Sequence, residues 1–146
     1  MSDITLYSSL LSANGRKAEA VCHHLSIAIN SVAINVYQGE GQTEHYLAIN
    51  PLGKIPALTT GDITVLESNA IIAYLADKYA DTPFTGESAE QRAAINQWLF
   101  WESAHWQPVL STVMERHVGH RFTNAGKRRY NPRHPVYPFT DTGSLS

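Results

Sequence analysis

The chain has 146 residues, of which 43% are hydrophobic, and its 11 Lys and Arg against 13 Asp and Glu give a formal net charge of −2. This composition is typical of a soluble globular protein, and no apolar run approaches the roughly 18 residues that a membrane-spanning helix needs. One cysteine excludes an internal disulfide framework, and residues 1–15 contain no visible signal peptide. We therefore expect a cytoplasmic protein that does not contact membranes.

Strand and helix patterns alternate along the first 80 residues. We predict, in order, a strand at 4–8, a helix at 15–25, a strand at 32–37, a short irregular helix at 43–49, a hairpin of strands at 56–60 and 63–66, and a helix at 68–79. Cys22 falls on the inner face of the first helix, where a thiol behaves as a small apolar residue. The order βαβ, helix, ββ, α is that of the thioredoxin fold, with parallel first strands joined by a right-handed crossover. We predict an α/β, thioredoxin-like domain over residues 1–80.

The composition changes after this domain. Residues 81–88 have the Pro, Gly and Thr content of a linker, and Ser88 or a neighbour caps a long helix over 89–118. Its apolar stripe is interrupted only by Glu102, and Pro108 should kink it.

The last part of the chain is basic and rich in proline. Residues 1–119 hold 6 Lys or Arg and 12 Asp or Glu, whereas residues 120–146 hold 5 and 1. Without helical periodicity, residues 120–146 bury too little apolar area to offset the entropy of ordering, so we predict a largely disordered tail. Its Lys127-Arg128-Arg129 run is typical of solvated charge rather than of nucleic-acid binding.

Two short motifs inside residues 50–74 indicate a binding site. Ile55-Pro56 is an X-Pro bond that can be cis, and a cis turn before a strand leaves the backbone N–H and C=O of Ile55 free to pair with another peptide. Glu67 and Ser68 stand between a strand and a helix, with Ser68 as the expected N-cap. Free N–H groups at that helix start attract a carboxylate. The pair of motifs therefore suits a short peptide with a free carboxylate.

These motifs resemble the glutathione-binding half of the glutathione S-transferases. In that family the Ile-Pro element pairs with the cysteinyl backbone of glutathione and the Glu-Ser pair holds its γ-glutamyl end. The resemblance implies these roles for Ile55, Pro56, Glu67 and Ser68, although Glu67 and Ser68 also have plain readings as a solvated carboxylate and a helix cap. Gln42 and Lys54 match positions that reach the glycyl carboxylate and backbone of glutathione; Lys54 could also be a solvated loop lysine.

The loop from Tyr7 to Lys17 matches the family's catalytic turn. Counting back from Arg16, Ser12 takes the position of the hydroxyl that donates a hydrogen bond to the glutathione sulfur. Such a donor beside a helix start lowers the thiol pKa from its ordinary value of about 8.5. Ser12 could instead only cap the helix, and Ser9 and Asn14 are the alternative donors.

The resemblance covers about residues 1–119 and stops there. Residues 92–108 look like bacterial, serine-type members, in which residues 89–119 would be the first helix of an all-helical second domain. Trp101 and His105 would then border the pocket of the hydrophobic second substrate. The remaining helices of the family have no counterpart, so the chain reads as truncated.

The combined reading is a glutathione S-transferase-like enzyme of detoxification, homodimeric if folded, that conjugates glutathione to a small apolar electrophile. The histidines lack the partners and spacing of a metal site, so glutathione is the only cofactor-like molecule implied. A non-catalytic thioredoxin-fold interaction module and an inactive truncated product are the alternatives.

Overall fold

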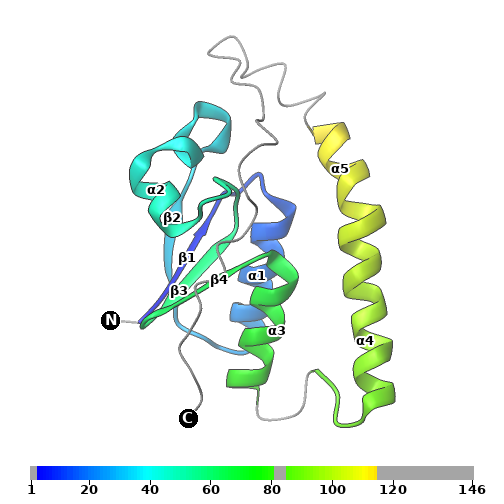
Figure 1. Ribbon diagram of the computed structural model, residues 1–146. Coiled ribbons are helices and arrows are strands. Elements are labelled where there is room, and N and C mark those ends of the chain that lie inside the picture. The colour runs from blue at the N-terminus through cyan, green and yellow to red at the C-terminus, as the bar shows by residue number, and fades with distance from the viewer. Residues whose placement is uncertain (1–2, 81–84, 115–146) are drawn as a thin grey trace, which may run out of the picture.

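The computed structural model of the protein describes residues 3–80 and 85–114 (Figure 1). The predicted linker lies partly, and the predicted tail wholly, outside the described residues. The strands and α-helices are β1 (Ile4–Ser8), α1 (Ala13–His24), β2 (Asn30–Ala33), α2 (Glu44–Ile49), β3 (Ala57–Thr60), β4 (Ile63–Leu66), α3 (Ser68–Tyr79), α4 (Ala89–Trp101) and α5 (Gln107–Met114). They are joined by two 3-10 turns and one π-helical turn, which are η1 (Val36–Gln38), η2 (Glu40–Gln42) and η3 (Glu102–Trp106).

The strands form one mixed sheet in the order β2-β1-β3-β4. β1 runs parallel to β2. On its other side β1 runs antiparallel to β3, with Leu6 opposite Leu58. β4 pairs antiparallel with β3 and completes the hairpin. Parallel neighbours need a crossover, which α1 supplies. The predicted thioredoxin-like α/β fold is confirmed.

The core lies between the sheet and the pair of helices α1 and α3, which cover one face of it (Figure 1). It consists of apolar side chains contributed by β1, β3 and both helices, namely Ile4, Leu6, Ala18, Cys22, Leu58, Ile71 and Leu75. Alternate residues of β1 point into this layer, as expected for a strand with one buried face. Cys22 is only 2% exposed, so its predicted role as a core residue is confirmed.

The second parallel strand differs from its prediction. We predicted 32–37, but β2 spans Asn30–Ala33 and all of its residues are exposed. Asn35 ends the extended segment, because its side-chain oxygen accepts from the Gln38 N–H (3.2 Å) and its own N–H donates to Glu40 Oε2 (2.6 Å). Such local side-chain bonds compete with the sheet ladder, so the chain turns into η1 instead.

Helix α1 starts two residues earlier than predicted, directly beside the end of β1. Ser12 is its N-cap and Gly15 lies in its first turn. A Cβ at Gly15 would overlap Ser8 Oγ. Glycine therefore allows the helix start to approach the strand end closely.

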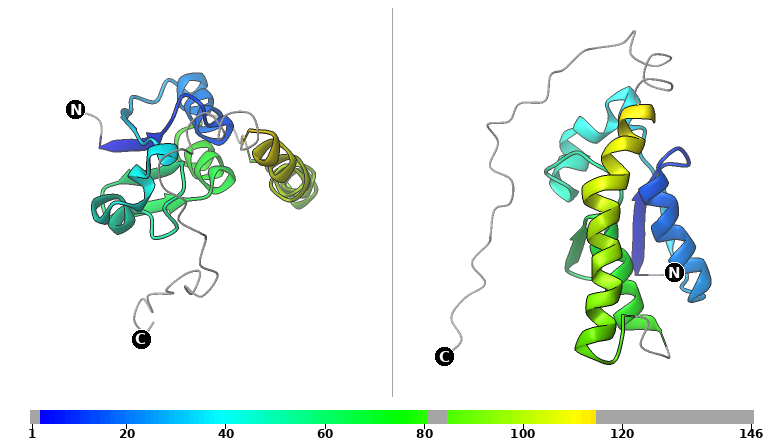
Figure 2. Two further views of the ribbon diagram at one scale, coloured as in Figure 1. Left: turned by 90° about the horizontal axis from the view of Figure 1, so that it is seen from above. Right: turned by 90° about the vertical axis from the view of Figure 1, so that its right-hand side faces the viewer.

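The predicted long helix is present over the described residues as α4, η3 and α5, which continue as one rod beside α1 and α3 (Figure 2). Ser88 caps it in a capping box with Gln91, as predicted for Ser88. Pro108 has no N–H for the Ala104 carbonyl. The irregularity expected there takes the form of the π-helical turn, in which the Gln107 N–H bonds to Glu102 O.

Candidate functional site

A cleft of about 1140 Å³ lies where the thioredoxin-like part meets the α4–α5 rod. Its walls are the turn between β1 and α1, the loop before β3, the start of α3 and one side of the rod. The cleft is lined by most of the residues that the sequence predicted, namely Ser9, Ser12, Asn14, Lys54, Ile55, Pro56, Glu67 and Ser68. The fold therefore brings together motifs that lie more than 50 residues apart.

The start of α3 offers free N–H groups to the cleft. The predicted cap was wrong: Glu67 is the N-cap, with φ 66° and no side-chain cap bond, and Ser68 is the first helical residue. The first bond of the helix runs from the Ile71 N–H to Glu67 O (2.9 Å). Within the described part of the chain, the N–H groups of Ser68, Asn69 and Ala70 thus lack a partner, as expected for a first turn.

The loop before β3 is held in place by hydrogen bonds from side chains of α2 and its C-cap. Ile55-Pro56 is cis, as predicted. Lys54 O accepts hydrogen bonds from Tyr46 Oη (2.7 Å) and Asn50 Nδ2 (2.7 Å), which anchor the loop to α2. No residue in the described ranges pairs with the backbone N–H or C=O of Ile55.

Tyr46 is the buried anchor of this arrangement. It is 1% exposed, and its ring contacts Tyr7 at a centroid distance of 5.9 Å. Burial raises the pKa of Tyr46 to about 12, opposed by its hydrogen bond with Asn50 and reinforced by Tyr7. The hydroxyl therefore stays protonated near neutral pH and can donate to Lys54 O.

The position of Ser12 is compatible with both of its predicted roles, as the cap of α1 and as a hydrogen-bond donor in the cleft. Its Oγ accepts the Gly15 N–H (3.1 Å) and so caps α1. A hydroxyl that accepts through a lone pair retains its hydrogen as a donor. Ser9 Oγ likewise accepts a backbone N–H, that of Leu11 at 3.4 Å, and Asn14 lies within the first turn of α1. Ser12 therefore caps the helix while its O–H is free to donate into the cleft.

Three predicted site residues lie off the cleft. Gln42 is exposed and its amide packs over Gly53, where an added Cβ would overlap it. Trp101 and His105 do not line the cleft; Trp101 is 46% exposed and stacks on Trp106 at 6.3 Å. The structure therefore places both rings outside the lining of the cleft in which their second-substrate role was expected.

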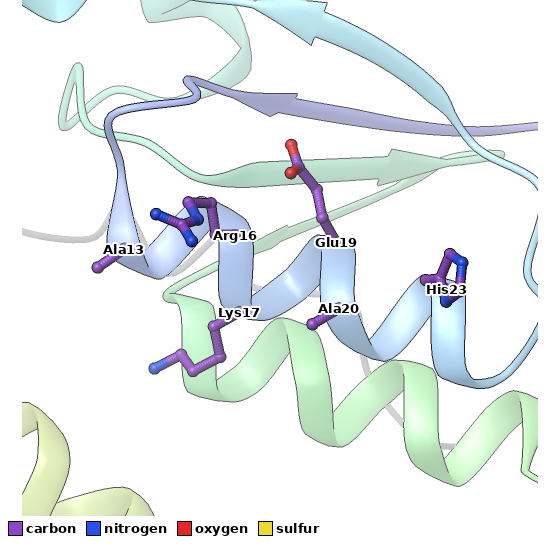
Figure 3. A pocket seen from close by; sticks show the side chains of 6 residues that line it. All are labelled: Ala13, Arg16, Lys17, Glu19, Ala20 and His23. Atoms are coloured by element: carbon purple, nitrogen blue, oxygen red, sulfur yellow. The ribbon is translucent and has the colours of Figure 1, made fainter.

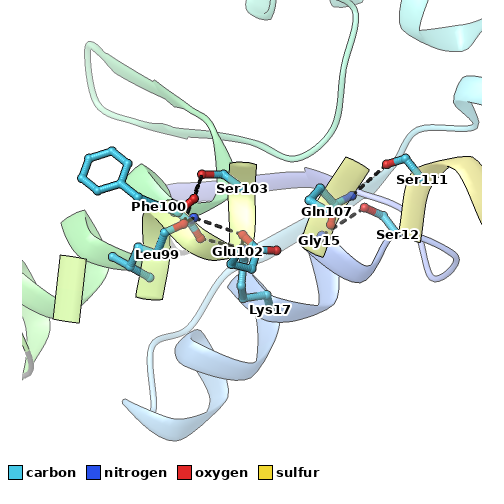
Figure 4. Close-up of polar contacts among 10 residues, drawn as sticks. Ser12, Gly15, Lys17, Leu99, Phe100, Glu102, Ser103, Gln107 and Ser111 are labelled. Carbon is cyan, nitrogen blue, oxygen red and sulfur yellow. Dashed lines mark hydrogen bonds and ion pairs between the residues drawn. The ribbon is translucent and has the colours of Figure 1, made fainter. Parts of the chain in front are cut away.

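Sequence reasoning missed a polar junction between the rod and the thioredoxin-like part (Figure 4). Lys17 Nζ donates to Asn69 Oδ1 (2.6 Å) and to Glu102 Oε2 (2.9 Å). Asn69 Nδ2 donates to Leu99 O (2.6 Å) and to Glu102 Oε2 (3.1 Å). The one signal in the sequence was Glu102, a carboxylate that interrupts an apolar stripe.

A second, shallow hollow lies along the outer side of α1 (Figure 3). It has a volume of about 650 Å³ and is lined by Ala13, Arg16, Lys17, Glu19, Ala20 and His23. It contains none of the predicted site residues.

Within residues 3–80 and 85–114, no group of three or more His, Cys, Asp or Glu is placed to hold a metal ion. No helix of that part is long and apolar enough to cross a membrane.

Comparison with known proteins agrees with this geometry. The sequence profile described as "Glutathione S-transferase, N-terminal domain" matches residues 6–83. Glutathione S-transferase F10 of Arabidopsis thaliana is 34% identical over 109 residues, which are 73% of this chain and 50% of that protein.

Solved structures match as well. The theta class glutathione S-transferase of Xanthomonas axonopodis pv. citri, with glutathione bound, has a TM-score of 0.73 at 30% identity over 79% of this chain and 55% of its own. Ure2p in complex with glutathione has a TM-score of 0.73 at 25% identity over 80% of this chain and 56% of its own. The chain spans about half the length of the curated relatives it matches first. With its fold, its cis Ile-Pro loop and a family match over more than half of its residues, the chain belongs to the glutathione S-transferase family.

Proposed function

We propose that the protein binds glutathione in the large cleft, stabilises its thiolate and conjugates it to a small electrophile. The observation that carries this proposal is that one cleft combines the free N-terminus of α3, the unpaired backbone of Ile55 and the Ser12 hydroxyl. The relatives solved with glutathione bound support it.

Each end of glutathione has a chemically matched partner. The γ-glutamyl carboxylate binds at the start of α3, where the N–H groups of Ser68 and Asn69 and the helix dipole favour negative charge. Glu67 lies beside it and accepts from the γ-glutamyl ammonium. The cysteinyl backbone pairs with Ile55, and the exposed Lys54 ammonium takes the glycyl carboxylate, with Gln42 nearby.

The Ser12 O–H donates to the sulfur and favours the thiolate over the thiol. Each unit by which the thiol pKa falls corresponds to about 1.4 kcal/mol of preference for the charged form. The thiolate then attacks the electrophilic carbon and forms the S–C bond. With an α,β-unsaturated carbonyl the C=C electron pair moves to the α-carbon, which takes a proton from water; with an alkyl halide the halide leaves with the bonding pair.

Further features of the proposal concern the whole protein. We place it in the serine-type branch of the family, of bacterial type, acting in the cytoplasm in detoxification. We divide it into a glutathione-binding domain at 1–80, a linker at 81–88 and a helical part at 89–119. We also propose a homodimer, supported by the exposed apolar face of the rod, which includes Trp98, Trp106 and Val109 at 53 to 63% exposure.

The proposal is tested by the thiolate absorbance of bound glutathione as a function of pH. We expect a pKa well below that of free glutathione in the wild-type protein. Ser12→Ala should raise this pKa while changing glutathione affinity little, and Asn14→Ala and Ser9→Ala should leave it unchanged. A bound thiol that titrates like the free one would refute the catalytic role, and the protein would then act as a binding module.

A further inference from the structure

The side of the cleft formed by the α4–α5 rod carries polar side chains among apolar ones. Its lining consists of Asn96, Leu99, Phe100, Glu102, Ser103, Gln107, Leu110 and Ser111, most of which carry polar side chains. The tryptophans that would make an apolar pocket, Trp98, Trp101 and Trp106, are absent from the lining and exposed. The wall that would meet a second substrate is therefore chemically unlike the pocket expected from sequence.

Two of these polar side chains are already used within the protein. The Ser103 hydroxyl contacts Leu99 O (3.1 Å) and Phe100 O (3.2 Å), where it donates to the backbone of its own helix. Glu102 accepts from Lys17 and Asn69, so its charge is compensated. These two residues are committed to structure.

Gln107 and Ser111, one helical turn apart, each keep a hydrogen-bonding group that has no partner among the described residues. Gln107 Nε2 donates to Ser111 Oγ (3.1 Å), while Gln107 Oε1 is buried with no hydrogen-bond partner among the described residues. The Ser111 hydroxyl hydrogen has no acceptor there either. Whichever way the amide is turned, one of its ends meets Ser111 and the other stays unpaired. Buried polar groups normally have partners, so an unpaired one in a cleft wall points to a ligand.

We propose that the second substrate is a polar electrophile, with a carboxamide or hydroxyl group next to its reactive carbon, and that Gln107 and Ser111 determine this specificity. The inference rests on the proposed conjugation and narrows its substrate class. A carboxamide supplies both the donor and the acceptor that the Gln107–Ser111 pair lacks. An apolar group of equal size would cover the pair and leave it unsatisfied, and a site of this kind rejects analogues that lack the hydrogen-bonding group.

The test compares the affinities of two glutathione conjugates whose sulfur substituents have the same branching and a similar size. S-(carbamoylmethyl)glutathione carries the carboxamide, and S-isobutylglutathione replaces its oxygen and nitrogen by methyl groups. Calorimetric titration of the full chain should give an affinity on the order of tenfold higher for the carbamoylmethyl conjugate. The double variant Gln107→Leu, Ser111→Ala should reduce that ratio to about one or invert it, with the affinity for glutathione unchanged.

Gln97→Leu is the matched control, because Gln97 is exposed on α4 and does not line the cleft; its affinity ratio should equal that of the wild type. Equal affinities of the wild-type protein for the two conjugates, or a ratio that the double variant leaves unchanged, would overturn the polar pocket while glutathione itself still binds. If neither conjugate nor glutathione binds, the proposed function fails together with it. The ratio of the two conjugate affinities in the wild-type protein tests the proposal without any variant.

Discussion

The Lys17 ammonium lies 2.9 Å from Glu102 Oε2, and each of the two side chains is 24% exposed. The pair joins the first turns of α1 to the start of the π-helical turn (Figure 4). Asn69, at the start of α3, bonds to both side chains. No residue of α4 is buried. A rod with so little apolar contact to the rest of the protein depends on this junction for its position beside the cleft.

Breaking the junction should destabilise the protein. Lys17→Met leaves Glu102 without its cation, and hydrogen bonds to charged groups contribute about 1.5 to 3 kcal/mol. We expect Lys17→Met and Glu102→Gln each to lower the free energy of unfolding in urea. In a double-mutant cycle the two changes should couple by more than about 0.5 kcal/mol. Lys78→Met removes an exposed lysine of α3 that donates to Tyr74 Oη (2.9 Å), and as the control it should show no coupling to Glu102→Gln. Additive effects of Lys17→Met and Glu102→Gln would contradict the junction.

The anchor of the cis-proline loop should respond to alkaline pH. The pKa of Tyr46 is raised to about 12 by burial, from its ordinary value of about 10. The buried, protonated Tyr46 hydroxyl therefore contributes to the free energy of unfolding. Because its folded-state pKa is raised, this contribution is fully present below about pH 10 and is lost as the pH rises toward about 12. Unfolding free energies measured from pH 8 upward should therefore fall above about pH 10. Tyr46→Phe should be less stable at pH 8, having lost the bond to Lys54 O, and should show a shallower decline. A decline of equal steepness in both proteins would count against this assignment.

The cysteine should be chemically silent in the folded protein. Cys22 is 2% exposed, and burial raises the pKa of its thiol. Because the thiolate is the reactive form, we expect an aromatic disulfide reagent to modify Cys22 only as fast as the protein unfolds. Addition of urea to unfold the chain should restore full reaction, and Cys22→Ala is the blank. Fast stoichiometric modification without urea would mean that the α1–sheet core opens readily.

The apolar face of the rod should mediate self-association. Trp98, Trp106 and Val109 are exposed, and an apolar patch of this kind is typical of interaction surfaces. Sedimentation velocity should reveal a concentration-dependent dimer that Trp98→Ser weakens. Gln97→Ser, at the neighbouring exposed position, should leave the dimer intact. A monomer at every concentration would exclude the proposed homodimer.

The sequence allowed the fold to be predicted because its signals are local. Periodicity placed β1 and α3 at their observed bounds, and turn chemistry placed the hairpin at Gly61. The cis bond at Ile55-Pro56 and the capping role of Ser88 were also confirmed. The bounds of β2 failed, since the turn that ends it depends on the Asn35–Glu40 bond rather than on the strand pattern.

The candidate site was predictable only where it consists of backbone and turn residues. The rod side was not, because η3 rotates the residues after Trp101 relative to a regular α-helix. His105, within η3, is therefore absent from the cleft lining, whereas Gln107 and Ser111 after it line the cleft. Trp101 lies before η3 and is absent from the lining as well. The junction of Lys17 with Glu102 joins residues 85 positions apart. The break that Glu102 makes in the apolar stripe signals a polar contact there, but no local pattern identifies Lys17 as its partner.

The central claim is that the cleft binds glutathione through the start of α3 and the cis-proline loop, and calorimetric titration with glutathione tests it most directly. We predict saturable binding with a free energy on the order of 4 to 8 kcal/mol, which corresponds to a micromolar to millimolar dissociation constant. Glu67→Ala should weaken binding several-fold, while Glu87→Ala, an exposed carboxylate outside the cleft, should leave it unchanged. No binding heat and no protection against thermal unfolding at about 10 mM glutathione would contradict the claim.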